Sequence, residues 1–221
     1  DTGVNMIIIT GASKGIGKYL LEKYADNGRD VYGTFNSTAP IDTYANRYQR
    51  VDVSSTDNIK NWFNNICSEN ENITIINAAG VNYNSFAHKS DLDKWKHVIE
   101  VNLFGTFSVI REILPRMRRQ KYGRIINCSS IVAQLGIPGT SAYAASKSAL
   151  WGLTKSLAVE NASLGITINN LNLGYFDIGM GLELPEAYRT SIKTKIPTEE
   201  FGNPENIYNA IQFLRDSDYV N

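Results

Sequence analysis

Residues 6–17 read Met-Ile-Ile-Ile-Thr-Gly-Ala-Ser-Lys-Gly-Ile-Gly. The first half is a short, β-branched run, which predicts a buried strand. Gly11, Gly15 and Gly17 follow, and an apolar pattern at helical spacing continues to about residue 24. A glycine-rich turn between a strand and a helix lets the backbone approach a pyrophosphate, which then faces the amides of the helix N-terminus. We therefore predict a dinucleotide site here; the alternative is a glycine turn without a ligand.

Apolar runs and helical patterns alternate along the rest of the chain. Predicted strands cover residues 6–10, 31–35, 48–53, 73–77, 124–129 and 166–172, and predicted helices cover residues 15–27, 55–70, 92–119, 141–161 and 203–214. This alternation predicts an α/β fold of three layers, α/β/α, with a Rossmann-type, doubly wound parallel sheet. No linker or repeat interrupts it, so we predict a single domain over residues 1–221. We expect the helix over residues 92–119 to break or bend near Pro115.

The bulk composition excludes several classes of protein. Basic and acidic residues are balanced at 22 each, which argues against nucleic-acid binding. No apolar run approaches the roughly 20 residues of a membrane span, and no signal peptide is evident, so we expect a cytoplasmic protein without a membrane partner. His88 and His97 lack partners at metal-ligand spacing, and we predict no metal. Cys67 and Cys128 are expected to be reduced thiols.

The two ends of the chain carry expectations of their own. Met6 directly precedes the first strand, so we interpret residues 1–5 as an artificial leader. The chain ends at Asn221 without a further strand, which would leave a sheet edge exposed. We therefore expect C-terminal residues to be missing.

Cofactor choice depends on the end of the second strand. A carboxylate there would hold the ribose hydroxyls of NAD and repel a 2′-phosphate. This chain has Phe35, Asn36 and Ser37 instead, and Lys14 in the glycine loop offers a positive charge. Both features favour NADP(H) over NAD(H), although Lys14 could also be a solvated surface lysine.

Three polar side chains predict the chemistry. Tyr143 and Lys147 are four residues apart, on one face of a predicted helix, and Ser130 ends the preceding strand. A nearby ammonium lowers the pKa of a phenol, so we expect Lys147 to lower the pKa of Tyr143. Tyr143 would then exchange a proton with a carbonyl oxygen as hydride is transferred, and Ser130 would hold that oxygen.

Together these motifs resemble the short-chain dehydrogenases/reductases, specifically the classical subgroup, from Thr10 to about Leu214. The resemblance rests on the glycine pattern, the turn over residues 77–80, Asn102, Ser130, and Tyr143 with Lys147. It implies that Asn102 anchors a water in a proton relay; the alternative is a residue at a helix kink. The dinucleotide contacts that we infer from the residues or from the resemblance are Gly11, Ser13, Lys14, Gly15, Ile16, Gly17, Asn36, Ser37, Asp52, Val53, Asn77, Ala78, Gly80, Tyr143, Lys147, Gly174 and Phe176.

The chain departs from the family pattern after the last predicted strand. The family often has Pro-Gly followed by a Thr that holds the nicotinamide carboxamide, and here Leu173 and Ile178 replace the Pro and the Thr. This puts the carboxamide contact in doubt. Either backbone groups near Phe176 replace that contact, or nicotinamide binding is weaker.

The sequence motifs define the residues that would contact the substrate less clearly. Ser130 and Tyr143 are expected to contact the substrate, together with Gln134, Leu135, Ile137 and Tyr175. The segment over residues 177–195 fits a mobile lid, or else a surface loop without a role. A basic run over residues 116–124 suits a helix C-terminus better than a docking patch for an acidic carrier protein.

These features support a reductase of a ketone or aldehyde, with a small-molecule partner. The resemblance implies a 3-oxoacyl-carrier-protein reductase as the commonest relative, and a reductase of a sugar or another polar metabolite as the runner-up. Two different functions compete with a reductase: a non-catalytic dinucleotide-binding regulator, and an epimerase or dehydratase of the extended subgroup. Relatives associate through their long helices, so we expect a homodimer or homotetramer.

Overall fold

Six parallel strands form the central sheet of the computed structural model, which describes residues 4–40, 43–67 and 71–221. Their order is β3-β2-β1-β4-β5-β6. The strands are β1 (Val4–Thr10), β2 (Asp30–Phe35), β3 (Tyr48–Arg50), β4 (Glu71–Asn77), β5 (Gly123–Ser130) and β6 (Ile166–Leu173). The strand order reverses between β1 and β4, the place where doubly wound sheets bind ligands.

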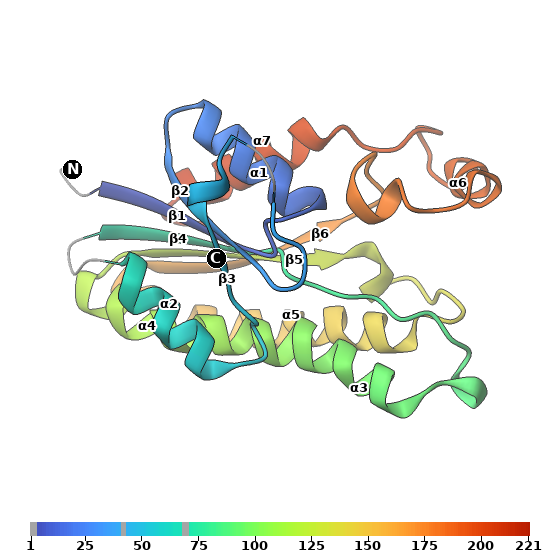
Figure 1. The fold of residues 1–221 in the computed structure, drawn as a ribbon, viewed down its shortest axis with the longest axis horizontal. Coiled ribbons are helices and arrows are strands. Elements are labelled where there is room, and N and C mark those ends of the chain that lie inside the picture. Colours follow the sequence, from blue (N-terminus) through green and yellow to red (C-terminus); the bar gives the residue numbers. More distant parts are fainter. Residues whose placement is uncertain (1–3, 41–42, 68–70) are drawn as a thin grey trace.

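Helices cover both faces of the sheet, as predicted (Figure 1). They are α1 (Gly15–Asp26), α2 (Thr56–Ile66), α3 (Leu92–Ile99), α4 (Thr106–Gln120), α5 (Ser141–Asn161), α6 (Glu186–Lys193) and α7 (Pro204–Asp216). Helices α1 and α7 pack on one face, and α2, α4 and α5 pack on the other. Because both faces are covered, β5 is buried along its whole length.

Polar residues start several of these helices. The side chains of Ser55, Asp91 and Asn203 each accept a hydrogen bond from a backbone N–H in the first turn of α2, α3 and α7. Such caps satisfy amides that have no partner inside the helix. Pro204 follows Asn203 at the first helical position, where its missing N–H costs nothing.

The long helix predicted over residues 92–119 is interrupted, but not at Pro115. Helix α4 continues through Pro115, and the irregular turn is the π-helix η3 (Glu100–Gly105), which joins α3 to α4. At Gly105 an added Cβ would lie 2.8 Å from Cγ2 of Val53, so only glycine lets this turn pack so closely on the loop after β3.

Several other predicted boundaries also differ from the structure. Strand β3 ends at Arg50, so Asp52 and Val53 lie in the following loop. Helix α2 ends at Ile66; residues 68–70 of the predicted helix lie outside the described residues. Residues 4 and 5 of the segment interpreted as a leader pair with β4, and residues 1–3 are not described. At the other end, Asn221 Oδ1 accepts a 2.7 Å hydrogen bond from the Ile168 amide of β6.

A ladder of buried polar side chains ties the middle of the sheet to α5. Asn77 donates to Asn127 Oδ1 (2.9 Å), and Asn127 donates to Thr154 Oγ1 (3.0 Å). Thr154 in turn donates to Asn170 Oδ1 (2.8 Å). Buried amides and hydroxyls are stable only with such partners, so the ladder holds β4, β5, α5 and β6 in one register.

A membrane span and a metal site each require recognisable features within residues 4–40, 43–67 and 71–221. No helix there is long and apolar enough to cross a membrane. Within the same ranges, no group of three or more His, Cys, Asp or Glu side chains is placed to hold a metal ion. Neither Cys67 nor Cys128 forms a disulfide with any residue in the described part of the chain.

Asn127→Ala should lower the free energy of unfolding by about 2–3 kcal/mol, because it removes the acceptor of Asn77 Nδ2 and the donor to Thr154 Oγ1. The matched control is Asn65→Ala on the exposed side of α2, which should leave stability nearly unchanged. Urea denaturation of both variants measures the effect. Equal stability of the two variants would show that the ladder does not hold the sheet together.

Candidate active site

In the glycine loop after β1, Gly11 and Gly17 are packed so closely that no larger residue fits at either position. The Gly11 amide donates to Thr34 Oγ1 (3.0 Å), and the Ala12 amide donates to the Thr34 carbonyl (2.7 Å), which ties the loop to β2. Gly11 has a φ of +67°, and an added Cβ would lie 2.5 Å from Cα of Ala79. An added Cβ at Gly17 would lie 2.4 Å from the Gly11 carbonyl oxygen.

This loop places the N-terminus of α1 at the point where the strand order reverses, between β1 and β4. Helix α1 begins at Gly15, and the side chain of its N-cap residue, Lys14, makes no capping hydrogen bond. Amides of the first helical turn lack partners inside the helix and carry a partial positive charge. A tight glycine loop that presents these amides fits a dinucleotide pyrophosphate. Ser13 lies in the same turn, and Ile16 packs partly into the core.

The residues predicted to surround the adenosine come from two strand ends. Asn36 and Ser37 are exposed directly after β2. The Asp52 carboxylate accepts hydrogen bonds from the Ser54 amide (2.9 Å) and hydroxyl (2.7 Å), and Val53 packs on Gly105. No residue from 35 to 37 is acidic.

Lys147 is buried in the centre of the site. Its side chain is 6% exposed, and Nζ donates a 2.7 Å hydrogen bond to the carbonyl oxygen of Cys128 on β5. The Lys147 carbonyl accepts a hydrogen bond from Ser129 Oγ (3.1 Å). Lys147 therefore links α5 to β5 through both its side chain and its backbone. Burial lowers the pKa of Lys147, because the charged form is poorly solvated there.

Tyr143 lies one turn before Lys147, beside Ser130. Nζ of Lys147 lies 5.7 Å from the centre of the Tyr143 ring. Burial raises the pKa of Tyr143, and the nearby Ser130 hydroxyl opposes that rise without cancelling it. Our expectation that Lys147 lowers the pKa of Tyr143 is therefore wrong for this structure. The phenol is protonated at neutral pH, the form that donates a proton.

Asn102 lies in the π-helix η3 and is fully buried. Its Oδ1 accepts from the Val81 amide (2.8 Å), and its Nδ2 donates to the Val81 carbonyl (3.0 Å) and to Ser146 Oγ (3.0 Å). Its own carbonyl accepts from Thr106 Oγ1 (2.9 Å). Asn102 therefore joins three segments, and its role in a proton relay stays a prediction.

Residues from three distant segments meet at Gly80. An added Cβ at Gly80 would lie 3.4 Å from Asn102 Oδ1 and 3.7 Å from Lys147 Nζ. Asn77 and Ala78 precede Gly80 in the same turn, and the Ala79 amide donates to Thr10 Oγ1 (3.2 Å). The turn over residues 77–80 thus touches both the glycine loop and the side chains of the predicted catalytic centre.

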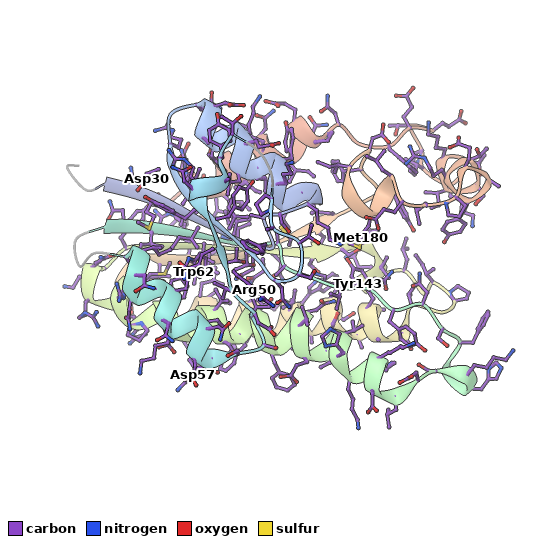
Figure 2. All side chains as sticks on the ribbon, in the orientation of Figure 1. Asp30, Arg50, Asp57, Trp62, Tyr143 and Met180 are labelled. Carbon is purple, nitrogen blue, oxygen red and sulfur yellow. The ribbon has the colours of Figure 1, made fainter. Side chains whose placement is uncertain are left out.

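The segment over residues 177–195 lies beside the glycine loop. The Gly179 position is so close that an added Cβ there would lie 2.8 Å from Cα of Gly15. Arg189 fastens the segment through a 2.6 Å ion pair with Asp177 and a 2.5 Å hydrogen bond to the Gly181 carbonyl. Figure 2 shows Met180 of this segment and Tyr143 toward the same end of the molecule.

The predicted substrate residues are distributed over two loops. Tyr175 is close enough to Tyr143 to influence its pKa, and its ring stacks on Phe201 at 6.0 Å. Gln134 and Leu135 are exposed, and Ile137 is half-buried.

The predicted cofactor contacts Gly174 and Phe176 follow β6. The side chain of Phe176 packs into the cluster between α1 and α7, and Gly202 lies against its ring. The backbone on both sides of Phe176 pairs with Gly202. Gly174 is exposed and Ile178 is half-buried, so Gly174 keeps an open backbone near the site.

The sequence motifs did not identify several residues that support the site. Ser146 and Thr106 hold the side chain and the carbonyl of Asn102, and Thr34 holds the glycine loop. The Cys128 carbonyl holds Lys147. Ser146 is three residues after Tyr143 and accordingly near it on α5, but nothing in the sequence pairs it with Asn102.

The chain is similar in sequence to known proteins. A family model described as short chain dehydrogenase matches residues 5–189. A 3-oxoacyl-[acyl-carrier-protein] reductase of Aquifex aeolicus is 34% identical over 218 residues, covering 94% of this chain and 88% of the relative. The enzyme of the same name from Vibrio cholerae is 31% identical over 214 residues, with the same coverage.

A solved structure is also similar. The crystal structure of the 3-oxoacyl-[acyl-carrier protein] reductase from Brucella melitensis superposes with a TM-score of 0.89 at 25% identity. The match covers 98% of this chain and 86% of that one.

Gly11→Ala should abolish dinucleotide binding, because a Cβ there collides with the backbone of Ala79. The matched control is Gly28→Ala at the end of α1, where φ is also positive (+68°) but nothing lies within 4 Å of an added Cβ. That control should cost about 1 kcal/mol of stability and leave binding unchanged. Fluorescence titration and thermal unfolding of both variants test this; normal binding by Gly11→Ala would contradict it.

Proposed function

Because the chain belongs to the short-chain dehydrogenase family, we propose that it reduces a ketone or aldehyde to an alcohol with NADPH, in a reversible reaction. The observation that carries this proposal is the convergence of Ser130, Tyr143 and Lys147 near the glycine loop, with Ser130 and Lys147 buried and Tyr143 half-buried. An acid, a hydrogen-bond donor and a cation at a dinucleotide site are what carbonyl reduction requires.

Each of these residues has a distinct task in the proposed reaction. Bound NADPH would supply the hydride that reaches the carbonyl carbon. Tyr143 gives its phenolic proton to the carbonyl oxygen, and the Ser130 hydroxyl holds the same oxygen. Lys147, fixed by the Cys128 carbonyl, would bind the ribose of the nicotinamide. Asn102 positions the turn at Val81.

NADPH is preferred over NADH in this proposal. The end of β2 carries Asn36 and Ser37 where a carboxylate would select the ribose hydroxyls of NADH. Lys14 is exposed at the start of α1 and offers a charge to a 2′-phosphate.

The substrate we favour is a 3-oxoacyl thioester, because the relatives with this name match most of the chain. A sugar or another polar ketone is the alternative, supported by the mixed polar and apolar lining of Gln134, Ile137 and Tyr175. NADPH oxidation followed with a panel of acetoacetyl thioesters and keto sugars separates the two classes. Tight NADPH binding without any turnover would favour a non-catalytic regulator.

A homodimer or homotetramer remains part of the proposal. Phe104 and Phe107, at the junction of η3 and α4, are 54% and 39% exposed. Large aromatic groups on a helix surface are typical of an interface. A cytoplasmic location likewise stays a prediction.

Tyr143→Phe should lower kcat for carbonyl reduction by about a thousandfold, because it removes the proton donor. NADPH binding should be nearly unchanged, since the ring and its packing remain. Tyr219→Phe is the control, because Tyr219 is 98% exposed. Steady-state kinetics and a fluorescence titration provide the two readouts. Loss of NADPH binding by Tyr143→Phe would contradict the role of Tyr143 as proton donor.

The pH dependence of the two directions should differ. Burial raises the pKa of Tyr143 above the usual value of about 10, so the proton donor is present at neutral pH. Carbonyl reduction should therefore stay constant through neutral pH and fall only as pH rises through that raised pKa. Alcohol oxidation needs the phenolate and should increase with pH. Measuring kcat/KM in both directions checks this; a reduction rate that halves near pH 7 would contradict it.

A further inference from the structure

We propose that Arg50, at the end of β3, binds the adenosine 2′-phosphate of NADPH and makes this chain select NADPH over NADH. The inference rests on the dinucleotide-binding function proposed above, and it assigns the selection to a residue that no motif identified.

The position of Arg50 follows from the pairing of two strands. The register of β2 and β3 places Arg50 opposite Phe35, the last residue of β2. Its Nε donates a 3.0 Å hydrogen bond to the carbonyl oxygen of Asn36, the first residue after β2. The guanidinium is thus tethered at the carboxyl edge of the sheet, beside the turn that decides between the two dinucleotides.

The charge of Arg50 is available to a ligand. The side chain is exposed, and within the described part of the chain it makes no salt bridge. Because the tether uses only Nε, the two Nη groups keep four N–H donors in one plane. That planar fork matches two oxygens of a phosphate, which is why arginine commonly recognises this group.

Neighbouring groups favour an anion at this place. The glycine loop is tied to Thr34 of β2, which brings the exposed Lys14 toward the same strand end. The carboxylate of Asp52, two residues after Arg50, is engaged by the amide and hydroxyl of Ser54. Lys14 and Arg50 would therefore face a 2′-phosphate from two sides. Neither charge would make an equally favourable interaction with the ribose hydroxyl of NADH.

Arg47 provides a matched control from the same region. Its Nη1 donates to the Val31 carbonyl (3.2 Å) and lies 3.7 Å from the Asp30 carboxylate, at the opposite end of β2. In Figure 2, Asp30 lies toward the far end of the sheet from Tyr143, and Arg50 lies between them. Arg47 and Arg50 thus carry the same charge three residues apart, but only Arg50 reaches the carboxyl edge.

The test is a fluorescence titration of the wild type, Arg50→Gln and Arg47→Gln with NADPH and with NADH. We expect Arg50→Gln to raise the Kd for NADPH about tenfold, the loss of one charge-assisted contact, and to leave the Kd for NADH unchanged. Arg47→Gln should change neither. Competition by 2′,5′-adenosine diphosphate should weaken in Arg50→Gln, and competition by 5′-adenosine monophosphate should not. Thermal unfolding confirms that both variants are folded.

The remaining outcomes overturn the inference in distinguishable ways. An unchanged Kd for NADPH in Arg50→Gln, with tight binding by the wild type, rejects the role of Arg50 and leaves the proposed function standing. Equal weakening of both dinucleotides would mean that Arg50 only supports the Asn36 turn. A wild type that binds neither dinucleotide, or that prefers NADH, overturns this inference together with the NADPH-dependent function on which it rests.

Discussion

The structure depends on the close approach of two backbone turns at the point where the strand order reverses. Gly11 lies so near Ala79 that no side chain fits between them, and the Ala79 amide donates to Thr10. This contact fixes the end of β1 against the end of β4. The N-terminus of α1 is aimed by the same contact, because Gly17 in its first turn packs on Gly11. One packing constraint therefore fixes both the position of the dinucleotide-binding surface and the arrangement of the central strands.

The side chains proposed to take part in the reaction are held on that frame by backbone groups. The Cys128 carbonyl holds Lys147, Ser129 reaches the Lys147 carbonyl, and the Val81 backbone holds Asn102. Backbone atoms at strand ends move little, so the side chains bound to them are pre-organised. Burial then sets their proton affinities: it raises the pKa of Tyr143 and lowers that of Lys147. The site is thereby suited to a neutral phenol that donates its proton in a dry setting.

Much of the fold and the reactive residues could be predicted from local patterns. The helix over residues 141–161 was predicted with the bounds that the structure has, since the segment is rich in Ala, Leu and Lys, which favour a helix, and contains no Pro. Strand ends were displaced by one to three residues, most in β3, because an edge strand has a partner on one side only. The expected break at Pro115 was wrong, because α4 continues through it; the irregular turn is η3, where Gly105 packs on Val53.

The sequence by itself determined the order of strands and helices along the chain and the glycine loop, and it predicted Ser130, Tyr143 and Lys147 as reactive residues, because each of these depends on residue type and short spacing. Only the tertiary structure decided the direction of the Tyr143 pKa, the partners of Asn102 and the place of Arg50 beside Asn36. These properties depend on burial and on which distant segments pack together. No local spacing records them, since residues 14 or 44 positions apart become neighbours only when the sheet and its helices assemble.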